Sequence, residues 1–119
     1  MKRISALVAV VAVAAVSVLT VVAYAGSSHA TAATITVKAT EFKFTLSKRS
    51  ALHGKVTFKV TNKGHVQHDF KITGKKTKLL SPGKSATLIV TLKKGKKYTY
   101  ICTVPGHAAA GMKGTFKAT

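Results

Sequence analysis

The chain of 119 residues carries 20 Lys and Arg side chains against 2 Asp and Glu, with one Cys and no Trp. This length allows one domain and excludes a large multidomain enzyme, and a single Cys excludes an internal disulfide. With Glu41 and Asp69 as the two acidic residues, we find no Ser-His-Asp grouping and no paired carboxylates of a glycosidase in the sequence. We therefore do not expect an enzyme.

An apolar run follows two positive residues at the N-terminus. Lys2 and Arg3 precede an Ala- and Val-rich stretch, and residues 23–25, Ala-Tyr-Ala, have the small-x-small pattern of a signal-peptidase site. Residues 1–25 are therefore predicted to be a signal peptide of an exported, periplasmic or extracellular protein. The run also reaches the ~20 residues that span a bilayer, so an uncleaved anchor on the outer face of the cytoplasmic membrane is the alternative.

Period-two alternation of apolar and polar residues dominates the remainder of the chain. Residues 26–33 are predicted to be a short linker, in which residues 30–32, Ala-Thr-Ala, offer a second cleavage site. The alternation predicts half-buried strands in segments 34–39, 41–46, 56–60, 86–92 and 112–118. Gly-, Asn- and Pro-containing turns separate the segments. Residues 34–119 are therefore predicted to form one all-β domain, an antiparallel β-sandwich of about seven or eight strands.

The single Cys lies in a segment that concentrates metal-binding side chains. A free thiol is a liability in an exported protein unless it is buried or bound. Cys102, His107 and Met112 follow one another at intervals of five residues and supply a thiolate, an imidazole and a thioether. His68 is the best fourth candidate, because it shares the strand parity of Phe70 and so faces the core. Two His, one Cys and a weak axial Met form the donor set of a blue-copper site.

The same residues have simpler interpretations. Cys102 could be a buried thiol that acts as a small hydrophobe, and Met112 could fill the core. His107 could be a surface residue in a turn. His65 stands three residues before His68 and is the rival for the fourth position. The spacing of the thiolate, imidazole and thioether favours the metal site over these alternatives, and zinc would not require a Met ligand.

With these motifs the chain resembles the cupredoxin family, the small blue copper proteins that include plastocyanin, azurin, pseudoazurin and auracyanin. The resemblance covers essentially the whole of residues 34–119. It rests on Asn-Lys-Gly at 62–64 ahead of His-Asp-Phe at 68–70, and on the segment 100–112 with its Pro-Gly-His turn. The Cys-x4-His-x4-Met spacing is closer to that of auracyanin than to the shorter loop of plastocyanin.

The resemblance implies a Greek-key β-sandwich that binds one copper ion, cycling between Cu(I) and Cu(II). His68, Cys102 and His107 would be the strong ligands and Met112 the axial one. The ring edge of His107 would reach the surface inside an apolar patch, where electrons cross. Asp69 stands where the family often has an Asn that ties the two ligand loops together, and an ionised carboxylate can accept such bonds but cannot donate them.

The predicted function is the transfer of single electrons between redox partners. Thiolate and thioether favour Cu(I), imidazole serves both oxidation states, and a rigid sandwich limits reorganisation. A copper-binding or delivery protein without redox cycling is the alternative from another class. A cationic surface-interaction module is a third interpretation, which requires the copper donor set to be accidental.

The charge balance predicts the chemistry of the partners. Without residues 1–25, 94 of the 119 residues remain, and the loss of Lys2 and Arg3 lowers the net charge from +18 to +16. Such a field favours an acidic docking face on a redox partner, or an anionic membrane surface. The aromatic residues alternate into the core instead of interleaving with Lys, so we expect no nucleic-acid binding. We expect a monomer.

Overall fold

The computed structural model describes residue 12 and residues 32–119. Apart from residue 12, the predicted signal peptide or anchor at 1–25 lies outside the described residues, and so does most of the predicted linker at 26–33. Within the described part of the chain, no helix is long and apolar enough to cross a membrane.

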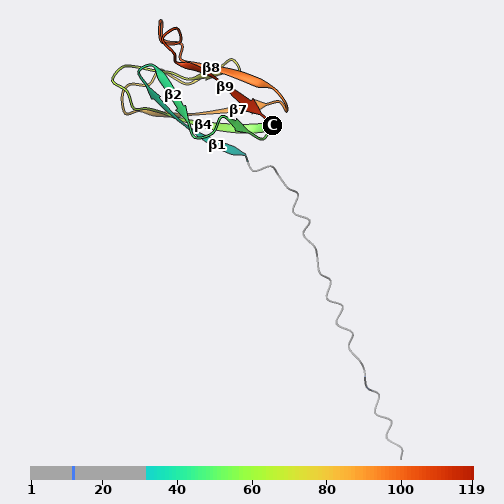
Figure 1. Cartoon of the computed structure of the whole chain (residues 1–119). Helices are drawn as coiled ribbons and strands as arrows, with labels where there is room; N and C mark the ends of the chain where they lie inside the picture. The colour runs from blue at the N-terminus through green and yellow to red at the C-terminus, as the bar shows by residue number, and fades with distance from the viewer. Residues whose placement is uncertain (1–11, 13–31) are drawn as a thin grey trace, which may run out of the picture.

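The described residues form nine strands in two facing sheets (Figure 1). The four-stranded sheet has the order β2 (Lys43–Leu46), β1 (Ala33–Thr40), β4 (Gly54–Asn62), β7 (Ser85–Leu92). The five-stranded sheet has the order β3 (Ser50–Ala51), β9 (Lys113–Ala118), β8 (Lys97–Ile101), β5 (Lys71–Ile72), β6 (Lys75–Lys76). The predicted all-β sandwich is confirmed. The strands outnumber the prediction because β3, β5 and β6 have two residues each, too few for alternation to reveal.

Not every strand pair is antiparallel. β1 pairs with β4 in parallel, and β3 pairs with β9 in parallel, whereas the other named pairs are antiparallel. The prediction of an antiparallel sandwich is therefore wrong for these two pairs. Alternation in a sequence determines which face of a sheet each side chain occupies, but it carries no information on the direction of the neighbouring strand.

Aromatic side chains join the two sheets across the core. Phe58 on β4 is fully buried, and its ring centroid lies 5.2 Å from those of both Phe70 and Phe116. Phe116 belongs to β9 of the opposite sheet. The Phe70 ring also stacks on Tyr100 of β8 at 5.5 Å and meets Phe44 of β2 edge-on at 5.3 Å. These contacts fix the spacing of the sheets and hence the position of the loops at their ends.

Two loops at one end of the sandwich carry the residues of interest. The segment 102–112 connects β8 to β9 and projects at the end of the sandwich away from the C-terminus, as Figure 1 shows. The segment 63–70 connects β4 to β5 and lies beside it, because Asp69 is hydrogen-bonded to Thr103. The sandwich thus supplies a rigid base on which two distant parts of the sequence meet.

We expect Phe58→Ala to lower the free energy of unfolding of the metal-free chain by about 3–5 kcal/mol, because it leaves a cavity between the sheets. Ile89→Ala on β7 is the control: its side chain is 51% exposed, and the change should stay within about 0.5 kcal/mol. Denaturant titration measures both values. Equally small effects of the two substitutions would contradict this packing of the core.

Candidate metal centre

Three side chains with metal-binding atoms converge where the two loops meet. The ligand atoms of His68, Cys102 and His107 all lie within 4.8 Å of one another. Nδ1 of His68 is 3.1 Å from Nδ1 of His107, and the latter is 3.5 Å from Sγ of Cys102. Nδ1 of His107 therefore lies beside both Nδ1 of His68 and the thiol. Two imidazole nitrogens and a sulfur are the borderline and soft donors that copper binds.

The thiol of Cys102 is held away from water. Its residue is 1% exposed, and burial raises the pKa of the Cys102 thiol, while the backbone N–H groups of Asp69 and Val104 oppose that increase. His68 is fully buried as well, whereas His107 is partly exposed. A buried thiolate needs a nearby positive charge, and a bound metal ion supplies one.

Met112 is held beside the other two residues of its loop. Its backbone N–H donates a hydrogen bond to the carbonyl of His107 at 3.0 Å, and its carbonyl accepts one from the N–H of Cys102 at 3.0 Å. The side chain of Met112 is fully buried. Short backbone bonds thus close the loop around the cluster and bring all four predicted residues to one end of the sandwich.

The backbone of His68 is fixed from both sides. Its N–H donates to the carbonyl of Leu80 at 3.1 Å, and its carbonyl accepts from the N–H of Leu80 at 2.7 Å. Asn62 secures the same loop: its Nδ2 donates to the carbonyls of Val66 and Leu80, and its Oδ1 accepts from the N–H of Gly64, each at 2.8 Å. Asn62 is the last residue of β4, and its side chain is fully buried.

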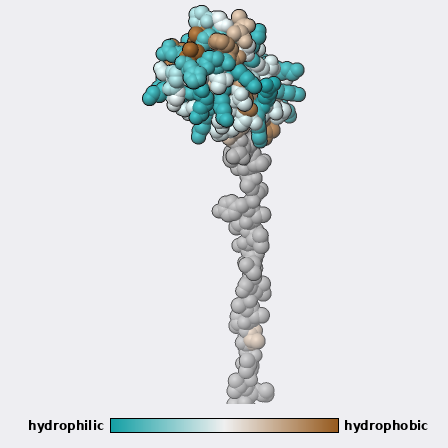
Figure 2. Space-filling view, turned by 60° about the vertical axis from the view of Figure 1, so that its left-hand side comes forward, coloured by the Kyte–Doolittle hydropathy of each residue, from teal (hydrophilic) through white to brown (hydrophobic). Residues whose placement is uncertain are grey.

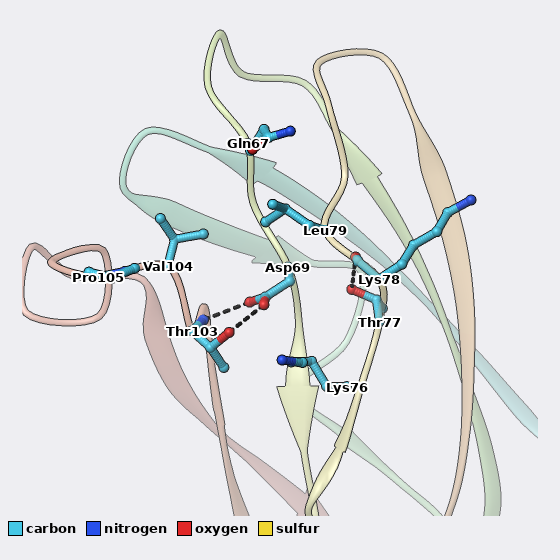
Figure 3. Close-up of a pocket in the computed structure, with 9 residues that line it drawn as sticks. All are labelled: Gln67, Asp69, Lys76, Thr77, Lys78, Leu79, Thr103, Val104 and Pro105. Atoms are coloured by element: carbon cyan, nitrogen blue, oxygen red, sulfur yellow. Dashed lines mark hydrogen bonds between the residues drawn. The ribbon is translucent and has the colours of Figure 1, made fainter.

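Asp69 connects the two ligand-bearing segments (Figure 3). One carboxylate oxygen accepts a hydrogen bond from the backbone N–H of Thr103 at 2.6 Å, and the other accepts one from the Thr103 hydroxyl. Asp69 follows His68, and Thr103 follows Cys102. The carboxylate accepts both bonds and links two neighbours of the cluster directly, a role that the sequence left open.

The remaining described histidines lie apart from the cluster. His65, the predicted rival of His68, is exposed, and the structure does not bring its ring into the group. His53 is exposed too, and its Nδ1 lies 2.9 Å from the carbonyl of Thr119. The prediction that His68 faces the core is confirmed, since His68 and Phe70 are both fully buried.

Glu41, between β1 and β2, is the residue of the site that the sequence reasoning missed. Its Oε1 accepts hydrogen bonds from the backbone N–H groups of His65 at 2.8 Å and Val66 at 3.1 Å, and it lies 3.0 Å from Nε2 of His68. These bonds, with that from His65 the strongest, lower the pKa of Glu41 to about 2. One feature of the sequence could have pointed to Glu41: acidic residues are rare in this chain, with two against 20 basic ones.

Comparison with protein families identifies the chain. The family model described as "Copper binding proteins, plastocyanin/azurin family" matches residues 17–119. The chain belongs to this family. A buried group of two His and one Cys in a member of the plastocyanin/azurin family fits a single type 1 copper ion, as predicted from the sequence.

Three solved structures share the fold of this chain. Reduced auracyanin from Roseiflexus castenholzii has a TM-score of 0.65 and 23% identity, covering 74% of this chain and 98% of its own. Azurin Az-iso2 from Methylomonas sp. strain J has a TM-score of 0.61 and 20% identity, covering 73% and 98%. Auracyanin A from Chloroflexus aurantiacus, a "blue" copper protein, has a TM-score of 0.60 and 20% identity, covering 72% and 98%. Curated protein sequences give no match.

We expect Thr103→Val to destabilise the metal-free protein by about 1.5–3 kcal/mol, because it removes a hydroxyl that donates to a buried carboxylate. Thr103→Ser keeps that hydroxyl and should cost clearly less. Denaturant unfolding of both variants measures the difference. If valine and serine are equally tolerated, the hydroxyl bond to Asp69 does not hold the two loops together.

Proposed function

We propose that the protein is an electron carrier with a mononuclear type 1 copper site. Nδ1 of His68, Sγ of Cys102 and Nδ1 of His107 are the proposed strong ligands, and Met112 is the proposed weak axial ligand. The observation that carries the proposal is the convergence of the three strong donors within 4.8 Å in a buried setting. Copper in such a site supplies a one-electron Cu(I)/Cu(II) couple.

The way the donors are held favours electron transfer over copper delivery. Cys102 and His68 are 1% and 0% exposed, and hydrogen bonds to Asp69 and Leu80 fix the segments that carry them. Donors that barely move on a change of oxidation state suit electron transfer, whereas delivery requires ligands that a recipient can replace. Of the three strong donors, only His107 is partly exposed. A site filled by four protein ligands also leaves no position for a substrate, which supports a carrier and not an enzyme.

Cu(II) added to the chain should give an intense blue absorption and a narrow copper hyperfine splitting, because a thiolate ligand produces both. Cys102→Ser and His68→Ala should abolish these features, and His65→Ala, three residues from His68, should leave them unchanged. Visible and electron paramagnetic resonance spectra measure the effect. A pale, ordinary Cu(II) spectrum that is the same in the wild type and in Cys102→Ser would refute the type 1 assignment.

Redox cycling distinguishes an electron carrier from a copper-delivery protein. Ascorbate should bleach the blue colour and hexacyanoferrate(III) should restore it, with the copper content unchanged after several cycles. Rapid loss of the reduced ion to a Cu(I) chelator would instead favour delivery. Each outcome is read from the same preparation by its visible spectrum and its metal analysis.

The proposed route for electrons is the exposed edge of His107. The Phe42 ring, 42% exposed, meets the His107 ring edge-on with centroids 5.0 Å apart. Ala109 and Ala110 on the same loop are exposed and small, so a partner can approach the imidazole closely. Figure 2 shows hydrophobic side chains gathered toward the upper end of the domain and surrounded by hydrophilic ones. We call the surface of Phe42, His107, Ala109 and Ala110 the His107 patch.

Positive charge beside this patch supports a partner with an acidic docking face. Lys76 and Lys78 line a hollow of about 450 Å³ that Val104 and Pro105 of the ligand loop border on the other side (Figure 3). In Figure 3 the Lys76 ammonium group points toward the ligand loop, whereas that of Lys78 points outward. Acidic side chains of a redox partner would meet these positive charges while its cofactor approaches His107. We propose such a protein as the partner of a monomeric chain that residues 1–25 direct to export.

The outer face of the five-stranded sheet supports the second proposed contact, an anionic membrane surface. Lys71 stands directly opposite Lys76, and Lys97 stands directly opposite Lys117. Like charges directly opposite one another destabilise a sheet. An anionic surface would relieve that repulsion, and it attracts each lysine close to it by about 1 kcal/mol.

Ala109→Asp should slow electron transfer from the reduced protein to hexacyanoferrate(III) several-fold, because it places negative charge where the anionic oxidant must approach. The control, Thr91→Asp, makes the same charge change at an exposed position of β7 toward the opposite end of the sandwich. Stopped-flow spectroscopy measures both rates. Equal slowing by both variants would contradict transfer through the His107 patch, and a collapsed copper spectrum in Ala109→Asp would mean that the loop is misplaced.

A further inference from the structure

The two ring nitrogens of His68 face different partners. Nδ1 lies 3.1 Å from Nδ1 of His107, inside the cluster, whereas Nε2 lies 3.0 Å from Oε1 of Glu41. The two nitrogens point away from each other across the imidazole ring. This contact therefore does not make Glu41 a member of the donor cluster. Glu41 is the partner of Nε2, the ring nitrogen that faces away from the cluster.

The carboxylate of Glu41 determines which nitrogen of His68 carries the proton. An ionised carboxylate only accepts hydrogen bonds, so at 3.0 Å Nε2 must be the protonated nitrogen of the neutral ring. Nδ1, which lies beside Nδ1 of His107 in the cluster, is then left with a bare lone pair. This tautomer is the one that binds a metal, and it exists before any ion arrives.

The carboxylate is itself fixed in place. Besides the contact to His68, Oε1 accepts the backbone N–H groups of His65 and Val66 from the loop that carries the histidine. Gly64 makes room for it, because a Cβ atom at that position would overlap with the Glu41 carboxylate. The two backbone hydrogen bonds and the room left by Gly64 thus hold the Glu41 carboxylate against His68. The Glu41 side chain is 26% exposed.

The pairing is selective in a chain rich in cations. Glu41 is one of two acidic residues among 20 Lys and Arg. Across residues 32–119 its ion-pair contact is with His68 and with no Lys or Arg side chain. Lysines are the abundant opposite charges in this chain, and the Coulomb attraction to a surface carboxylate is available to each of them. That this one faces a buried imidazole indicates a role in the site.

We propose that Glu41 is a positioning residue that holds His68 in its Nδ1-unprotonated tautomer and lowers the reduction potential of the copper site. The effect on the potential rests on the proposed function, whereas the tautomer does not. Negative charge at Nε2–H makes Nδ1 a stronger donor, which favours Cu(II) over Cu(I). The β1–β2 turn therefore contributes to the site although it supplies no ligand.

The tautomer is tested in the metal-free protein by ¹⁵N NMR of the histidine rings at neutral pH. In the wild type, His68 should have a protonated Nε2 and a bare Nδ1. Glu41→Ala should let both tautomers populate, while the ring of His53, remote from the cluster, stays unchanged. A wild-type proton on Nδ1, or an identical tautomer in Glu41→Ala when the fold is intact, would overturn the proposal whether or not the chain binds copper.

The potential is tested with Glu41→Gln, which keeps the side chain's size and an acceptor oxygen but removes the charge. Cu(II) binding should weaken roughly tenfold relative to Cu(I) binding, a rise of about 59 mV for one electron. Gln67→Lys adds the same unit of charge next to His68 without touching its ring, and should raise the potential by less than half as much. If both variants raise the reduction potential equally, the effect comes from net charge and not from the contact with His68, and the proposed role of Glu41 is wrong. An unchanged potential in Glu41→Gln would also refute the proposal.

Discussion

The hydrogen bonds from Thr103 to the Asp69 carboxylate join the two chain segments that carry the candidate ligands. His68 directly precedes Asp69, and Cys102 directly precedes Thr103. The positions of the buried imidazole and the buried thiol therefore depend on these hydrogen bonds. The sandwich provides the base: Leu80 fixes the backbone of His68, and the aromatic core holds the sheets from which both loops start. The donors are thus placed by the protein itself, which is what a site with little reorganisation between oxidation states requires.

Both acidic residues of the chain act at this one end of the molecule. Asp69 bonds to the segment after Cys102, and Glu41 bonds to the loop before His68 and to its ring. The remaining surface carries almost only positive charge, with lysines opposite one another on the outer sheet face. Negative charge is therefore confined to positions where it orders the site, and positive charge remains for attracting anionic partners. This division links the unusual composition to the proposed function.

The sequence predicted the features that depend on local pattern. Alternation identified β1, β4 and β7, and strand parity selected His68 over His65. Spacing identified the segment from Cys102 to Met112. The parallel pairing of β1 with β4 could not be predicted, because alternation is the same for either direction. The contact of Glu41 with His68 joins residues 27 positions apart, and it depends on how the β1–β2 turn lies against another loop, which only the tertiary structure determines.

The most direct test of the proposed copper site is a crystal structure of the copper-loaded chain with anomalous scattering measured on both sides of the copper absorption edge. We expect one anomalous peak bonded to Nδ1 of His68, Sγ of Cys102 and Nδ1 of His107, with the sulfur of Met112 along the axis. Copper bound by exposed nitrogens elsewhere, with Cys102 free of metal, would contradict a type 1 site in this protein and with it the electron-carrier function.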